Sequence, residues 1–446
     1  MHVSINLPLI LIYFVLIDIT FDDINGLYNT ENIAKAAKHY SLTAMAIRVG
    51  LSLDEPQVQQ TKCWAWSIFP LIIWTRILGV NLSDISNSSA KRHHWLIIAY
   101  GGFCLLCHLA GQIDILYYLQ GKLKIGSLEQ SGGLNFETST ATWNSIIDFI
   151  NYAVHGIGTH VLMLTVIRKR WINLMETFRR SEDMFSDERY IRIRKVATYG
   201  VAYVILLILG LISVSLGHHL AAGTTSGHRI FISCMSTISI IYPLTALVVF
   251  AIHCYVSSLL FESVQSEIHR NEIQLMNGRD QDVRFLMLTF KQRHILACKT
   301  ADSINHCFGW ILLLSITFFY LAVINSSFYL FGLDNIISMP DVAFTTFTVI
   351  HLIFVCFTAD RVQIKAEDAI KELFRLQSYE TLNGSQMQLM NSLISEMSLT
   401  VPKISANGCF NVSKKLLPQV IGTSLTYFFI LFQFEASEKN VTLTEN

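Results

Sequence analysis

Aromatic, carboxylate, amide and hydroxyl side chains stand near one end of several apolar segments of the sequence. They are Gln112 and Asp114; Trp143, Asn144 and Asp148; His218 and His219; Tyr320, Asn325 and Tyr329; and Asp341, Thr345 and Thr346. Polar groups at such positions are costly and usually functional. Rings can stack on the C–H face of a sugar while carboxylates and hydroxyls bind its hydroxyl groups, so the set predicts a pocket for a small polar ligand. Some of these residues can instead cap helix ends, as Asp341 beside Pro340 would.

The last apolar segment, residues 416–434, carries a second candidate group. Gln433 is polar and lies near one end of the segment, with Ile430 one helical turn earlier on the same face and Phe434 and Glu435 following. Around an axis shared by several copies, an apolar ring would lie next to an amide ring, a pair that can close a pore by dewetting. Taken alone, these residues fit a helix end that reaches water at least as well.

Residue patterns of enzymes do not occur in the sequence, which has no Gly-rich phosphate loop, metal-spaced His/Glu set or nucleophile elbow. Cys104 and Cys107 form a C-x-x-C pair without a second pair, so we expect packed thiols and no metal. Lys+Arg and Asp+Glu both number 33, which gives no net charge toward nucleic acid. We therefore expect no catalytic residue, no cofactor and no nucleic-acid partner.

The elements that must position these residues are membrane helices. The chain is 52% hydrophobic and only 15% charged, whereas soluble proteins are nearer a quarter charged. A spanning helix needs roughly 20 mostly apolar residues. The sequence thus predicts an all-α membrane protein with seven transmembrane helices. Their ranges are 93–118, 143–167, 195–217, 230–259, 308–331, 340–358 and 416–434.

Basic residues predict the orientation, because Lys and Arg concentrate on the cytosolic side of membrane proteins. They gather in the connections 168–195, 260–307 and 359–415. The connections on the opposite side hold only Lys122, Lys124, Arg229 and Lys439. We expect a cytosolic N-terminus and an extracellular C-terminus.

The regions outside the seven spans complete the predicted plan. Residues 1–62 form an N-terminal region to which we assign no structure. Residues 63–92 form an interfacial helix and a cytosolic link, because Trp64, Trp66, Trp74 and Arg76 suit the headgroup layer. Residues 93–414 hold six spans and long cytosolic connections, 415–435 the seventh span, and 436–446 a short extracellular tail.

The long inner connections have a helical pattern. In residues 361–376 one face collects apolar side chains and the opposite face collects charges. The apolar positions are Val362, Ala366, Ala369, Ile370, Leu373 and Phe374. We expect the membrane helices to continue into a cytosolic helical bundle, where either subunits meet or the chain packs on itself.

The final span carries a motif: Thr426 and Tyr427, five apolar residues, then Gln433 and Phe434. It resembles the T-Y-h-h-h-h-h-Q-F signature (h, apolar) of the gustatory receptor family within the insect and arthropod chemoreceptor superfamily. The run Ala406–Asn411 resembles the family's small-x-Gly-x-Phe segment, and the runs 291–296 and 304–309 resemble its fourth-to-fifth connection. The resemblance covers roughly residues 64 to 435.

This resemblance implies a gustatory receptor, a multi-pass protein in the plasma membrane of chemosensory neurons. It implies a ligand-gated cation channel, a homo- or hetero-tetramer with other gustatory receptors, in which four copies of the seventh helix line one pore. Ile430, Gln433, Phe434 and Glu435 would then form the pore and gate, with the four Glu435 carboxylates favouring cations. The outer-half pocket would bind a tastant, such as a sugar or a bitter compound, through Asp114, Trp143, Asn144, Asp148, His218, Tyr320, Asn325, Tyr329, Thr345 and Thr346.

Two other classes of membrane protein are alternatives to this one. A metabotropic receptor that signals through G proteins would have the opposite topology, and no Asp/Glu-Arg-Tyr follows the third span. A transporter would show internal repeats with broken helices, and Pro243 in the fourth span is the only interior break candidate. The metabotropic receptor is the main alternative.

Overall fold

The computed structural model describes residues 63–80, 82, 99–113, 140–221, 227–277, 280–331, 339–378 and 383–444. The chain divides into two units, Met1–Thr61 and Lys62–Asn446, and all described residues lie in the second. The predicted N-terminal region 1–62 and most of the link up to residue 92 fall outside the described residues.

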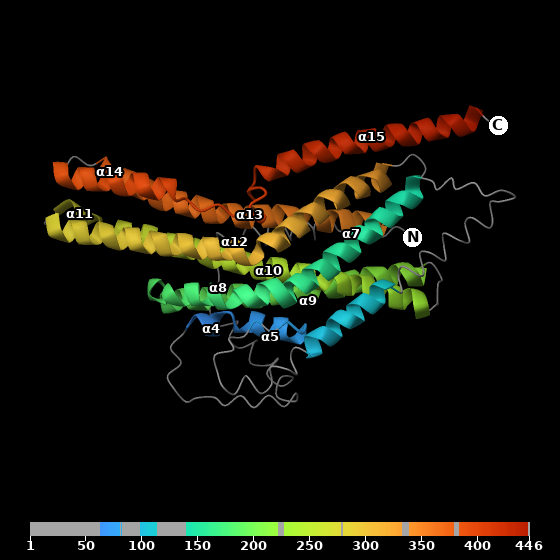
Figure 1. The fold of residues 1–446 in the computed structure, drawn as a ribbon, viewed down its shortest axis with the longest axis horizontal. Coiled ribbons are helices and arrows are strands. Elements are labelled where there is room, and N and C mark those ends of the chain that lie inside the picture. The colour runs from blue at the N-terminus through green and yellow to red at the C-terminus, as the bar shows by residue number, and fades with distance from the viewer. Residues whose placement is uncertain are drawn as a thin grey trace. The chain divides into compact units, whose positions relative to one another are not determined.

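The described part is helical, apart from one antiparallel bridge between Ser405 and Asn411. Figure 1 shows how the helices lie. In chain order they are α4 (Trp64–Ser67), α5 (Phe69–Ile77), an apolar helix (Ala99–Ile113), α7 (Thr140–Leu162), the π-helical turn η1 (Met163–Ile167), α8 (Arg168–Arg180), the short η2 (Glu182–Met184), α9 (Asp187–Ala221), α10 (Gly227–Arg270), α11 (Glu272–Asn277), α12 (Asp280–Phe331), α13 (Met339–Gln377), α14 (Gly384–Leu399) and α15 (Leu416–Thr444).

Apolar helices occur at all seven places where spans are predicted. Within the described residues, five are long and apolar enough to cross a membrane: Phe149–Arg180, Asp187–Val214, Ile240–Arg270, Gln281–Asn325 and Thr345–Gln377. Two shorter apolar helices are Ala99–Ile113 and Leu416–Ile430. The predicted all-α membrane fold is confirmed, while the direction in which the chain crosses the membrane stays a prediction.

Several of these helices are far longer than a bilayer requires. α12 has 52 residues and α13 has 39, against roughly 20 for a span. α13 runs without a break through the predicted span 340–358 and the amphipathic segment 361–376. Of that segment's apolar face, Val362 and Leu373 are fully buried, but Phe374 is 51% exposed and does not belong to the core face.

α10 lies at the centre of the packing. It contacts α7, α9, α12 and α13, and nearly every residue from Tyr242 to Val264 is buried. Phe250 and Phe261 are among its fully buried side chains. Pro243 does not break α10, which is continuous from Gly227 to Arg270.

The segment predicted to lie in the headgroup layer is helical, as α4 and α5. Leu71 and Thr75 of α5 are buried, whereas Ile73 and Ile77 on its other side are exposed. Trp74 Nε1 donates a hydrogen bond to Thr245 Oγ1 of α10 (3.1 Å). One side of α5 is thus fixed to the bundle, and the other is apolar and exposed, as a helix in the headgroup layer would be.

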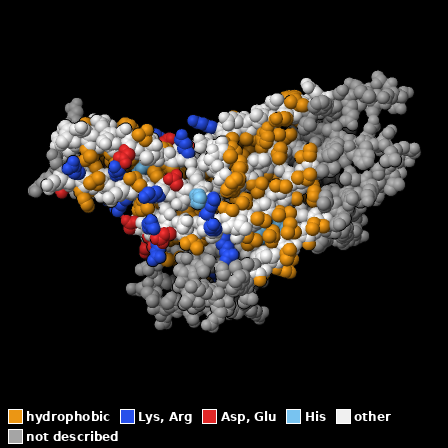
Figure 2. All heavy atoms as spheres, in the orientation of Figure 1, with side chains coloured by type: hydrophobic (Ala, Val, Ile, Leu, Met, Phe, Trp, Pro, Cys, Tyr) orange, Lys and Arg blue, Asp and Glu red, His pale blue; other side chains and the backbone are white. Residues whose placement is uncertain are grey.

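Side-chain types are unevenly distributed over the visible face. Figure 2 shows hydrophobic side chains gathered on the half of the view that carries α15 and the start of α7, and most charged side chains on the half that carries α11 and α14. On this face, the described charged side chains therefore lie mainly toward the predicted cytosolic ends of the helices.

Candidate ligand pocket and pore helix

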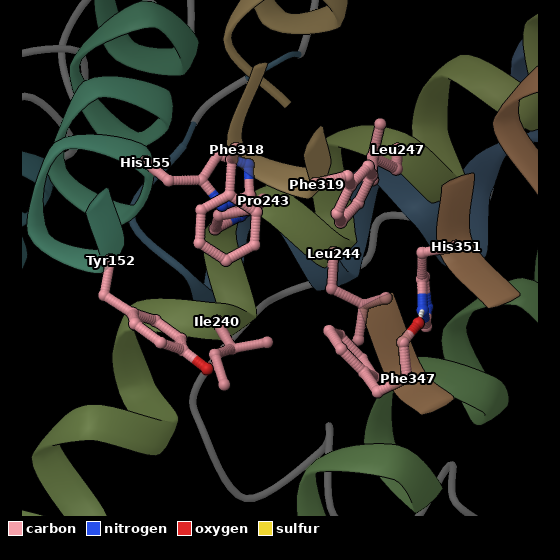
Figure 3. A pocket seen from close by; sticks show the side chains of 10 residues that line it. All are labelled: Tyr152, His155, Ile240, Pro243, Leu244, Leu247, Phe318, Phe319, Phe347 and His351. Atoms are coloured by element: carbon pink, nitrogen blue, oxygen red, sulfur yellow. Dashed lines mark hydrogen bonds between the residues drawn. The ribbon is translucent and has the colours of Figure 1, made fainter. Parts of the chain in front are cut away.

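A cavity lies between α7, α10, α12 and α13, near the middle of four predicted spans (Figure 3). Its enclosed volume is about 10 Å³, about the room that one water needs, so a larger ligand fits only if the surrounding helices move apart. Its lining residues are Tyr152 and His155 of α7; Ile240, Pro243, Leu244 and Leu247 of α10; Phe318 and Phe319 of α12; and Phe347 and His351 of α13. The walls are mainly aromatic and aliphatic, and none of the ten side chains is acidic or a Lys or Arg.

Helical periodicity brings these residues together. On α10 the lining positions are 240, 243, 244 and 247, which is the spacing of a single helix face. The two lining residues of α7 are three positions apart, and those of α13 are four apart, so each pair also shares a face. Each helix therefore turns one side toward the cavity.

His155 joins α7 to α12. Its ring stacks on Phe318, with ring centroids 4.0 Å apart and an interplanar angle of 18°. Its Nε2 lies 3.0 Å from the hydroxyl of Ser315, one turn earlier on α12. His155 and Ser315 are both buried, so this hydrogen bond forms in a region without bulk water.

His351 joins α13 to α9 on the other side of the cavity. Its Nδ1 lies 2.6 Å from the Phe347 carbonyl oxygen, which can only accept, so Nδ1 carries the proton. Its Nε2 lies 2.6 Å from the Tyr203 hydroxyl. In the neutral ring Nε2 is then an acceptor, and Tyr203 donates to it. Both ring nitrogens of His351 are thus engaged within the protein.

Of the ten ligand-binding candidates from the sequence, the four whose side chains the structure describes do not line this cavity. Tyr320, Thr345 and Thr346 are half-buried and adjoin lining residues in sequence, and Asn325 is buried farther along α12. The remaining candidates fall outside the described residues or side chains: Asp114, Trp143, Asn144, Asp148, His218 and Tyr329. Ligand binding by these ten residues stays a prediction.

The residues that sequence reasoning missed are the two histidines of the cavity. His155 lies inside the predicted span 143–167 and His351 inside 340–358. Ionisable side chains inside apolar spans are functional candidates by default, so the signal was present in the sequence. Both histidines lie near the middle of their spans, whereas the candidates predicted from the sequence lie toward the outer ends of the spans.

The final helix α15 packs against α12 and α13 and leaves much of its apolar surface uncovered. Thr426 Oγ1 donates to the Gly422 carbonyl oxygen (3.0 Å), so its hydroxyl is satisfied within the helix. Tyr427 and Ile430 are 51% and 41% exposed, and Gln433 is also exposed. Other exposed apolar side chains on α15 are Ile421, Leu425 and Phe429. Phe434 and Glu435 belong to α15, but their side chains fall outside the described ones.

The connection that leads into α15 is fixed to α12 and α13. The Asn305 side chain of α12 donates to the Lys403 carbonyl oxygen (2.7 Å) and accepts from the Ser405 backbone N–H (2.9 Å). Directly before α15, Lys414 Nζ lies 3.6 Å from Asp360 Oδ2 of α13. These contacts fix the start of α15 to both α12 and α13.

Comparison with known proteins places this architecture in a family. The family model described as 7tm Chemosensory receptor matches residues 135–438. Among solved structures, the chain is similar to the insect olfactory receptor OR5 from Machilis hrabei in complex with eugenol. The TM-score is 0.57 at 13% sequence identity, and the match covers 82% of this chain and 97% of that chain. A second OR5 structure gives a TM-score of 0.53 at 14% identity, with the same coverage.

At these identities the structural likeness shows the fold alone. Among curated proteins no sequence matches the chain. The family model, in contrast, covers well over half of the 446 residues. The chain therefore belongs to the 7tm chemosensory receptor family.

Proposed function

We propose that this chain is a gustatory receptor, a ligand-gated cation channel in the plasma membrane of chemosensory neurons. The observation that carries the proposal is the final helix. α15 is apolar, bears the Thr426-Tyr427 and Gln433-Phe434 motif, and leaves Tyr427, Phe429 and Ile430 exposed on the single chain. An apolar helix with uncovered sides fits a position beside copies of itself.

The pore in this proposal is formed by four copies of α15. Gln433 is exposed, as a side chain that faces a shared axis would be. Ile430 lies one turn away, so an apolar ring next to an amide ring can close the pore by dewetting. Glu435 would follow at the outer mouth and favour cations. The tetramer contains this chain alone or this chain with other gustatory receptors.

The ligand in this proposal binds in the cavity between α7, α10, α12 and α13. OR5, which shares the fold, has been solved in complex with eugenol, and this supports a small molecule as the ligand here. α12 and α13 contribute Phe318 and His351 to the cavity, and the same two helices contact α15. A ligand that pushes these helices apart would thus act directly on the pore helix.

The test is the full chain purified, reconstituted into liposomes and exposed to a panel of tastants. A ligand-evoked cation flux through the protein alone supports the channel. Responses that occur only in cells and require G proteins, with no flux in liposomes, would instead favour the metabotropic class.

A further inference from the structure

The cavity has one lining histidine whose hydrogen-bonding capacity is not used up. Both ring nitrogens of His351 form hydrogen bonds, one with the Phe347 carbonyl oxygen and one with the Tyr203 hydroxyl. Among the described residues, His155 makes one polar contact, from Nε2 to Ser315 Oγ. The Nδ1 atom of His155 has no hydrogen-bond partner among the described residues, and it is not completely enclosed by other atoms. A ligand in the cavity can therefore bond to His155 Nδ1.

The Ser315 hydroxyl makes this nitrogen adaptable. A hydroxyl can donate or accept. If Ser315 donates to Nε2, Nδ1 carries the proton and offers an N–H to the ligand. If Ser315 accepts from Nε2–H, Nδ1 offers a lone pair. The His155–Ser315 pair can thus meet either a carbonyl or a hydroxyl on a ligand.

The rest of the cavity favours flat, weakly polar molecules. His155 and Phe318 are stacked, and Tyr152 meets Phe318 edge to face, with centroids 5.3 Å apart. Phe347 and His351 form a further ring pair at 4.1 Å. Figure 3 shows these rings around the hollow, with Leu244 between the two histidines. Aromatic rings of a ligand would pack offset or edge-on against such walls.

A sugar fits these walls poorly. None of the ten lining side chains is a carboxylate or an amide, so most sugar hydroxyls would lose their bonds to water without replacement. Each such loss costs about 1–3 kcal/mol. This modifies the expectation from the sequence, in which polar side chains at the ends of the spans suited a sugar.

We propose that the cavity selects a small planar aromatic molecule with one hydrogen-bonding group, which binds to His155 Nδ1, and that the Ser315 hydroxyl adapts to whichever tautomer of His155 the ligand requires. The inference rests on the proposed function, since it assigns a ligand class to the same receptor. His155 is then the residue that determines specificity, and the rings around it supply most of the contact area.

The test uses four probes: p-cresol, which has one hydroxyl; acetophenone, which has one carbonyl; toluene, which has neither; and sucrose. Binding is measured as thermal stabilisation of the full chain purified in detergent, a readout that does not require an open pore. All four probes are used at the same low concentration, at which sucrose does not act as a stabilising osmolyte. p-Cresol and acetophenone should then stabilise the protein, and sucrose should not. His155→Phe keeps the ring stack on Phe318 but removes both nitrogens. This substitution should lower the affinity for p-cresol and acetophenone about three- to tenfold, the effect of one lost hydrogen bond. The affinity for toluene should change by no more than about twofold.

The matched control is His351→Phe, at a ring whose nitrogens are engaged within the protein. It should change the affinity for all three aromatic probes by a similar factor. If His155→Phe does not yield folded protein, Ser315→Ala is the second variant. It should lower the affinity for p-cresol and acetophenone by a smaller factor and leave the affinity for toluene unchanged.

Three results would overturn the inference: sucrose binds while the aromatic probes do not, none of the four probes binds, or His155→Phe weakens toluene as much as p-cresol. Failure of the proposed function looks different. Binding of p-cresol without cation flux in liposomes argues against the channel and leaves the ligand class standing. A sucrose-evoked cation flux that His155→Phe does not alter would support the channel and contradict the proposed aromatic ligand class.

Discussion

Gly309 of α12 lies so close to Asn407 that a Cβ atom at position 309 would be 2.9 Å from the Asn407 backbone nitrogen and 3.0 Å from its Cα. Asn407 has a positive φ of 51° and is followed by Gly408 at 79°, so the turn bends sharply at this contact. The two residues belong to the runs 304–309 and 406–411, which the sequence marks as separate family-like segments. The structure shows that these segments pack against each other at the entrance to α15.

Gly309→Ala should therefore destabilise the protein by about 1–3 kcal/mol, because the new methyl group meets backbone that cannot move aside easily. The matched control is Gly210→Ala on α9, where nothing lies within 4 Å of the added Cβ. In a helix that exchange normally stabilises by about 0.5–1 kcal/mol. The melting temperatures of the two purified variants test this prediction. Equal melting temperatures for Gly309→Ala and Gly210→Ala would contradict the close contact at Gly309.

The long helices were predictable because their cause is local. α13 carries an apolar run and then a charged amphipathic run in one sequence without a break, and both patterns are visible along the chain. The position of Phe374 was not predictable in this way. It shares the spacing of Leu373 and Ile370, but about half of its surface stays uncovered, since it is 51% exposed.

The cavity was predictable only in part, because it is a long-range property. Sequence indicates that α7, α10, α12 and α13 cross the membrane, but not which faces meet. His155 and Ser315 are 160 positions apart, and only the packing of α7 on α12 brings them together. Their depth, near mid-span, moves the candidate site inward from the residues that the sequence favoured.

Lys414 and Asp360 should couple the end of the predicted sixth span to the start of α15. Lys414 Nζ is 3.6 Å from Asp360 Oδ2 and 4.5 Å from the centroid of the Phe357 ring. Lys414→Glu should shift the ligand concentration for half-maximal current several-fold, since two carboxylates then repel each other. Adding Asp360→Lys should restore part of the shift, as a double-mutant cycle would measure.

The control for this pair is Lys415→Glu, the same charge change one residue later. Lys415 is exposed, and no ion pair of it is found among the described residues. Its reversal should leave the half-maximal concentration within about twofold, as for an ordinary surface charge. If Lys414→Glu and Lys415→Glu have the same effect, the ion pair does not contribute to gating.

The predicted orientation can be measured on intact cells. An epitope tag after Asn446 should bind antibody without permeabilisation, because the basic connections predict an extracellular C-terminus. A tag inserted in the connection between α13 and α14 should bind only after permeabilisation. Reversed labelling of the two tags would invert the topology, and with it the direction in which α15 presents Gln433.

Gln433 is the residue through which the pore proposal is most directly tested. Its side chain is exposed on the single chain, and Ile430 one turn earlier is 41% exposed. If four copies surround the pore, Gln433→Ala removes four amides from the wall and should lower single-channel conductance or alter ion selectivity. Gln433→Glu adds four carboxylates and should raise the preference for cations, divalent ions above all.

The two substitutions at position 433 act as controls for each other. Misfolding would lower surface expression and ligand sensitivity in both variants, whereas a position in the pore would change ion selectivity differently in each. Reversal potentials measured under bi-ionic conditions separate the cases, because they do not depend on the number of channels. Unchanged conductance and selectivity in both variants would place Gln433 outside the pore. In that case its amide serves only to bond water at the end of α15, the role that its position near a membrane surface would give it without any pore.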